Sequence, residues 1–215
     1  MGGFSVEKYN QLPSISEASS LFKYQLESAG LTDSQFFAEL APVFTVDDKP
    51  GPYSPWLIHH HFSLNENERM VSYGNRSAPS SDTSPNIVPE CWLSAGEDIE
   101  HRYVDDLGSI PPPPSADLLC QFEAILDKHG IDVLGICYAP PVDDLPPGFC
   151  FLETLVPEER AQIINQVPES SIDPATTSPS NWILDGGLRC VPSSRCGVNC
   201  INHLVPHRYN IDPHK

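Results

Sequence analysis

Residues 56–73 read WLIHHHFSLNENERMVSY, and the fold expected for the chain is built around this stretch. Its first half, residues 56–64, is rich in large apolar and aromatic side chains and predicts a strand. The polar residues 65–67 predict a turn, and residues 69–73 predict the return strand. We therefore expect an antiparallel hairpin here, with the other elements arranged around it.

Three consecutive histidines, His59, His60 and His61, lie in the first expected strand. Because successive side chains of a strand point to opposite faces, His59 and His61 should share one face, and His60 should lie on the more apolar face. Two imidazoles at this spacing can bind one metal ion, and Glu66 or Glu68 beyond the turn would add a carboxylate. The alternative is that the histidines are ordinary strand residues.

A fourth candidate, His101, belongs to a second expected hairpin formed by residues 87–93 and 99–104. It would serve as a further metal ligand or as an acid–base group, so His59, His61 and His101 are the candidate catalytic residues. The same groups without a metal ion would suit an isomerase, a cyclase or a dehydratase.

The histidine segment resembles the first metal motif of the cupin family, in which a His-x-His pair is followed by a glutamate and then a glycine. The matching residues are His59, His61, Glu66 and Gly74. The spacing departs from the family pattern in two places, and the second cupin motif has no clear match. The resemblance implies a metal ion bound by the two histidines.

Residues 57–71, 131–139 and 196–200 are similar to segments of small uncharacterised proteins of filamentous fungi. This resemblance spans much of the chain. It implies a cytosolic fungal protein, such as an accessory protein of specialised metabolism, and it implies no particular activity.

The remaining elements predict an α+β fold. Ser14 with Glu17, and Thr32 with Gln35, form the capping boxes of two N-terminal helices. The other expected elements are a helix from Ser115 to Gly130, strands over residues 131–138, 149–156 and 181–184, a flexible connector over residues 75–86, and a helix from Pro157 that turns Ile163, Ile164 and Val167 inward.

The expected architecture is thus an antiparallel sheet flanked by N-terminal helices and by helices of the C-terminal half. Residues 1–187 would form one domain, and residues 188–215 an irregular tail. The tail contains Cys190, Cys196, Cys200, His203 and His207, whose thiolates and imidazoles suit zinc. A disordered tail, or a disulfide from Cys200 to Cys190 or Cys196, is the alternative.

The formal net charge of −17 argues against nucleic acid and membrane surfaces as partners, because both are anionic. Neither a signal peptide nor an apolar run long enough to span a bilayer appears, so a cytoplasmic protein is expected. The seven cysteines favour reduced thiols, with Cys120, Cys137 and Cys150 packed in the core.

These patterns predict an accessory enzyme acting on a small molecule, with zinc or another divalent transition metal as its cofactor. The alternative to an enzyme is a non-catalytic interaction protein that uses the proline run 111–114 and a zinc-stabilised or disordered tail as contact elements. The sequence does not indicate an oligomeric state.

Overall fold

The computed structural model describes residues 4–47, 49–105, 112–138, 146–184 and 190–197. Four α-helices lie in these ranges. They are α1 (Val6–Asn10), α2 (Ile15–Ser28), α3 (Asp33–Phe44) and α4 (Ala116–His129). Both predicted capping boxes are present at α2 and α3, and Ser115 caps α4. Helix α3 continues past Pro42, which lies inside its last turn.

The strands in the described residues are β1 (Thr45–Val46), β2 (Lys49–Pro50), β3 (Tyr53–Leu57), β4 (Arg69–Tyr73), β5 (Arg76–Ser80), β6 (Ile87–Trp92), β7 (Asp98–Tyr103), β8 (Leu134–Tyr138), β9 (Phe149–Val156), β10 (Ala161–Pro168), β11 (Thr177–Leu184) and β12 (Cys190–Gly197). Short 3₁₀ turns occupy Pro157–Glu159 and Glu169–Ser171. The strand predicted from Arg69 and the hairpin of β6 and β7 are confirmed. The antiparallel hairpin expected between residues 56–64 and 69–73 is not formed, because β3 pairs with β8 and β11 whereas β4 pairs with β5 and β7.

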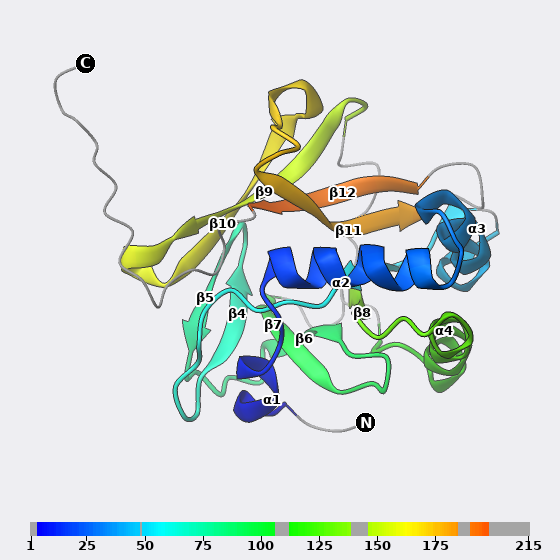
Figure 1. The fold of residues 1–215 in the computed structure, drawn as a ribbon. Coiled ribbons are helices and arrows are strands. Elements are labelled where there is room, and N and C mark those ends of the chain that lie inside the picture. The colour runs from blue at the N-terminus through cyan, green and yellow to red at the C-terminus, as the bar shows by residue number, and fades with distance from the viewer. Residues whose placement is uncertain (1–3, 48, 106–111, 139–145, 185–189, 198–215) are drawn as a thin grey trace, which may run out of the picture.

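Strands β3 to β12 form one closed barrel in the order β10-β5-β4-β7-β6-β8-β3-β11-β12-β9, with β9 paired to β10 (Figure 1). The α+β class is confirmed, but the sheet is mixed and not simply antiparallel. Strand β4 runs parallel to β7, and β12 runs parallel to β9. Closure removes free sheet edges and encloses an interior.

Two segments expected to lack strands belong to the barrel. Residues 75–86, predicted as a connector, contain β5, which pairs with β4 and β10. Residues 190–197, predicted as part of an irregular tail, form β12 between β11 and β9. The tail prediction is therefore wrong for β12, whose polar, proline-containing sequence hides its strand character. Residues 198–215 lie outside the described ranges.

The helix expected from Pro157 is also absent. The proline and the two glutamates after it form one 3₁₀ turn, and Arg160 then adopts a left-handed conformation with φ 46°. The chain reverses there, and β10 pairs with β9 along its whole length. The C-terminal half of the described chain thus contributes one α-helix, α4, because the apolar residues 163, 164 and 167 belong to a strand.

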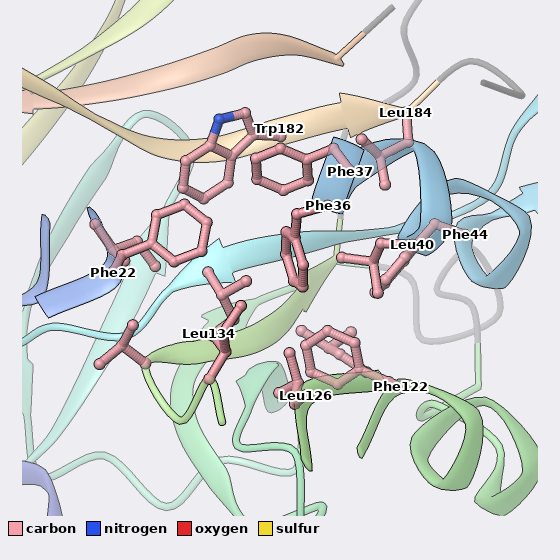
Figure 2. Close-up of a cluster of buried hydrophobic side chains, with 14 of the residues drawn as sticks. Phe22, Phe36, Phe37, Leu40, Phe44, Phe122, Leu126, Leu134, Trp182 and Leu184 are labelled. Atoms are coloured by element: carbon pink, nitrogen blue, oxygen red, sulfur yellow. The ribbon is translucent and has the colours of Figure 1, made fainter. Parts of the chain in front are cut away.

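Helices α2 and α3 bury their apolar faces against the outside of the barrel around β11, and α4 packs against α3 in the same cluster (Figure 2). Phe37 lies 4.9 Å from Trp182 of β11, measured between ring centroids, and Phe22 lies 5.8 Å from the same indole. Phe44 of α3 meets Phe122 of α4 edge to face. Each buried aromatic side chain contributes roughly 2–3 kcal/mol, so this cluster holds the helices on the sheet.

Gly135 in β8 permits the close approach of β6. A Cβ atom at this position would lie 2.4 Å from the carbonyl oxygen of Trp92 and 3.3 Å from Ile58 Cγ1. Because the first neighbour is backbone of a paired strand, the clash cannot be relieved by a side-chain rotation.

We expect Gly135→Ala to lower the free energy of unfolding by about 3 kcal/mol or more, through displacement of β6 from β8. Gly130→Ala is the control, because it has open space around it and a left-handed φ of 64°, and should cost about 1 kcal/mol. Urea unfolding curves measure both. Equal losses for the two variants would contradict the close strand approach.

Candidate metal centre

The barrel interior contains a cavity of about 290 Å³. Its walls include the aromatic rings of Trp56, Tyr138 and Phe151, from three different strands. The polar residues that line it include His61 and Glu153. A cavity with aromatic walls and a few convergent polar groups is the usual form of a small-molecule site.

Four potential metal ligands converge at one edge of this cavity. They are His59, His61, Glu153 and Cys196, and one ligand atom from each lies within 4.8 Å of the others. All four side chains are buried, with exposed fractions of 0% for His59 and Cys196, 2% for His61 and 7% for Glu153. The two imidazole rings are 4.6 Å apart and nearly perpendicular.

Barrel closure brings these residues together from distant parts of the sequence. The histidines follow β3 directly, where the chain leaves the sheet and His60 N–H donates to the carbonyl of Pro13. The parallel pairing of β12 with β9 places Cys196 opposite Glu153. The predicted strand therefore ends earlier than expected, at Leu57, yet His59 and His61 still point to the same cluster.

The hydrogen bonds around the cluster fix how its groups are presented. Nδ1 of His59 lies 2.6 Å from the carbonyl oxygen of Leu57, so the ring donates there and leaves Nε2 directed at the cluster. That Nε2 is buried, 3.9 Å from Glu153 Oε2, and has no hydrogen-bond partner among the described residues. Ser180 Oγ–H donates to Glu153 Oε1 at 2.6 Å and holds the carboxylate in place.

The ionisation of the cluster favours metal binding at neutral pH. Burial, with a smaller contribution from His59, lowers the pKa of His61 to about 3, so its imidazole is neutral. Burial alone would raise the pKa of Glu153. The electrostatic attraction of the neighbouring His59 and His61 rings and the hydrogen bond from the Ser180 hydroxyl outweigh burial and lower this pKa to about 2. A neutral imidazole beside a carboxylate is the form that binds divalent cations.

The acids expected beside the histidines lie elsewhere. Arg160 donates to both carboxylate oxygens of Glu68, at 3.0 and 2.9 Å, and this hydrogen-bonded pair lowers the pKa of Glu68 to about 2. Glu66 is exposed on the turn. The structure thus brings Glu153, and neither of these residues, to the histidines. His60 is also outside the cluster, with Nδ1 2.5 Å from the carbonyl oxygen of Leu12.

His101 is buried but does not reach the cluster. Its neighbours Glu100 and Arg102 line the cavity, so on β7 His101 points to the other face, where its ring lies 5.4 Å from that of Phe4. Its Nδ1 has no hydrogen-bond partner within the described part of the chain. The geometry gives it no contact with the cavity, and its catalytic role stays a prediction.

The five residues of the expected zinc site in the tail are only partly described by the structure. Cys196 faces the barrel interior with the two histidines, and Cys190 begins the same strand. Cys200, His203 and His207 lie outside the described residues.

The other cysteines are only partly core residues. Cys150 is buried, whereas Cys120 is exposed on α4, so its predicted core position is wrong. Cys137 lies opposite Cys91 on the neighbouring strand, and both line the cavity.

Sequence reasoning missed Glu153 as a candidate ligand. The one local signal was a single glutamate within the otherwise apolar strand FCFLETLV, since a charge in a buried strand needs a partner. For the pairing of Cys196 with this glutamate no local signal exists, because it depends on the register between strands far apart in sequence.

No family model matches this chain, and neither the curated proteins nor the solved structures include a significant match. The cupin resemblance therefore has only the His59, His61 and Glu153 grouping and the curled sheet as loose support. Among the described residues, no helix combines the length and the apolar character needed to cross a membrane.

The buried imidazole of His101 should make the free energy of unfolding depend on pH. Burial, assisted by the charge of Arg69, lowers its pKa to about 4, below the ordinary value of 6.5. As the pH falls from 6.5 toward 4, the unfolded chain takes up a proton that the native ring does not, so the native state loses stability. We expect His101→Leu to remove up to roughly 3 kcal/mol of this loss. Urea unfolding at several pH values measures the loss of stability. The same dependence of the unfolding free energy on pH in the parent protein and in His101→Leu would refute the prediction.

Proposed function

We propose that the protein is a metal-dependent enzyme that acts on a small organic molecule bound in the barrel cavity. The carrying observation is the buried Nε2 of His59, which lacks a hydrogen-bond partner in the described structure and is directed at His61 and Glu153. A buried nitrogen in this state costs free energy unless it binds a proton or a metal ion.

The chemistry of the donors supports a borderline transition metal. Two imidazoles, one carboxylate and one thiol are ligands that zinc accepts in tetrahedral geometry, and the site would also accept other divalent transition metals. The backbone carbonyl of Leu57 behind His59 and the hydroxyl of Ser180 behind Glu153 orient the ligands, as outer groups do in metal sites.

Access from the cavity supports a catalytic role. His61 and Glu153 belong both to the ligand cluster and to the cavity wall, whereas His59 and Cys196 belong to the cluster alone. A metal ion held there would be within reach of a bound molecule, where it would supply Lewis-acid polarisation of an oxygen or a lowered pKa for a bound water.

Two other functions are weaker. A metal-free acid–base enzyme would use the same His59 and Glu153 pair, and the metal titration below separates the two. An interaction protein would present the proline run as a contact element. However, Pro112 accepts a hydrogen bond from the Tyr53 hydroxyl and Pro114 is buried, so this part of the run is held against the body.

We expect the protein purified without an affinity tag to bind one zinc ion in its barrel. His59→Ala and His61→Ala should each weaken this binding by more than about a hundredfold, because each removes a direct ligand, and loss of an outer group alone costs ten- to a hundredfold. His60→Ala is the matched control, since its ring contacts Leu12 outside the cluster. Zinc titration against a competing chelator gives the affinities. Equal affinities for all three variants and the parent would end the metal proposal.

Cobalt substitution tests Cys196. If its sulfur is a ligand, the Co²⁺ protein should show a thiolate-to-cobalt charge-transfer band in the near ultraviolet, and Cys196→Ser should remove it. Cys120→Ser, on the exposed surface of α4, is the control and should keep the band. Absence of the band in the parent protein would mean that the ion has only the two imidazoles and the carboxylate, with a position open to substrate.

A further inference from the structure

Away from the metal ligands, the same cavity contains a second polar group with a different character. Glu90 and Cys91 of β6 and Glu100 and Arg102 of β7 line it, and none of them belongs to the metal cluster. The hairpin thus presents two carboxyl groups and one cation to the interior.

Arg102 already interacts with two residues of the cavity wall. Its guanidinium lies 3.6 Å from a carboxylate oxygen of Glu90 and 5.1 Å above the ring of Tyr138, measured from Cζ to the centroid. This wall of the cavity therefore holds one cation by the combination of a carboxylate and an aromatic face. It leaves no other lysine or arginine among the described cavity residues to pair with Glu100.

Of the two carboxyl groups on this hairpin, Glu90 lies beside the guanidinium of Arg102, and Glu100 has no such ion pair among the described residues. Its Oε1 is buried and has no hydrogen-bond partner in the described structure, and its Oε2 has only a weak contact with Cys91 Sγ at 4.0 Å. Burial, with repulsion from Glu90 and Glu153, raises the pKa of Glu100 to about 8. The charged and titratable groups that face it are these two carboxylates, Arg102 and the thiols of Cys91 and Cys137.

We infer that Glu100 is the anionic partner for a cationic ligand, and that the cavity takes a small protonated amine with an apolar group. The unpaired carboxyl supplies the counter-charge, and the aromatic walls formed by Trp56 and Phe151 receive the apolar part. A cation entering this cavity meets three carboxyl groups and one guanidinium, so the local field attracts it, while an anion is repelled. The inference deepens the proposed function by naming a ligand class for the same cavity.

The test is a series of ligands of similar shape and different charge. Calorimetric titration at about pH 8.5 keeps most of Glu100 ionised and an alkylamine protonated. The probes are 2-phenylethylamine, 2-phenylethanol and phenylacetate, with ethylamine as a smaller amine. We expect 2-phenylethylamine to bind roughly tenfold more tightly than the alcohol, and phenylacetate to bind weakest.

The variant Glu100→Gln should lower the affinity for 2-phenylethylamine by roughly tenfold and leave the affinity for the alcohol nearly unchanged. Glu66→Gln is the matched control, because it removes the same charge from the exposed turn outside the cavity and should change neither. Thermal unfolding checks that both variants are folded. An alcohol that binds as tightly as the amine, a preference that survives Glu100→Gln, or no binding of either amine would each overturn the inference.

The same titration in His59→Ala protein separates this inference from the metal proposal. Glu100 lies outside the metal cluster, so the preference for the amine should persist when no metal binds. Loss of zinc binding with the preference intact would confirm both assignments as independent. A parent protein that binds no zinc but prefers the amine would refute the metal centre alone.

Discussion

The burial of several ionisable groups at one point inside the barrel is the constraint on which the rest of the structure depends. Removing imidazoles, a carboxylate and a thiol from water costs free energy that hydrogen bonds or a bound ion must offset. The structure provides part of this through the carbonyl of Leu57 and the hydroxyl of Ser180. These partners provide no hydrogen bond to His59 Nε2, the nitrogen that faces Glu153. A divalent cation bound there would be coordinated by this nitrogen and by the neighbouring ligand atoms.

Barrel closure is what makes such a centre attainable. The ligands come from the segment after β3, from β9 and from β12, and the last two meet through parallel pairing, with Cys196 opposite Glu153. Between them, β11 pairs with β3 on one side and with β12 on the other. The helical layer packs on the outside of this same region, where Trp182 of β11 joins the aromatic cluster, so the stability of the core and the position of the ligands are connected.

What the sequence allowed one to predict was local, and what it missed was set by long-range pairing. The capping boxes of α2 and α3 and the hairpin of β6 and β7 depend on residues close in sequence, and they were predicted. Residues 161–168 place apolar side chains at spacings that suit either a helix or a strand, and only the pairing with β9 selects the strand. Likewise, the two histidines were recognisable from their spacing, while the carboxylate and the thiol beside them depended on strand register.

The metal cluster and the polar groups of the β6–β7 hairpin also differ in whether long-range or local pairing positions them. The metal cluster depends on three segments brought together by closure, so a change in the register of any of them would disperse it. Glu90, Glu100 and Arg102 lie on one hairpin whose register is set locally between adjacent strands. Under the proposed function, substitutions on this hairpin would change which molecule the cavity accepts without displacing the proposed metal ligands. A barrel built in this way would keep the proposed metal centre fixed by topology and leave selectivity to side chains that can vary singly.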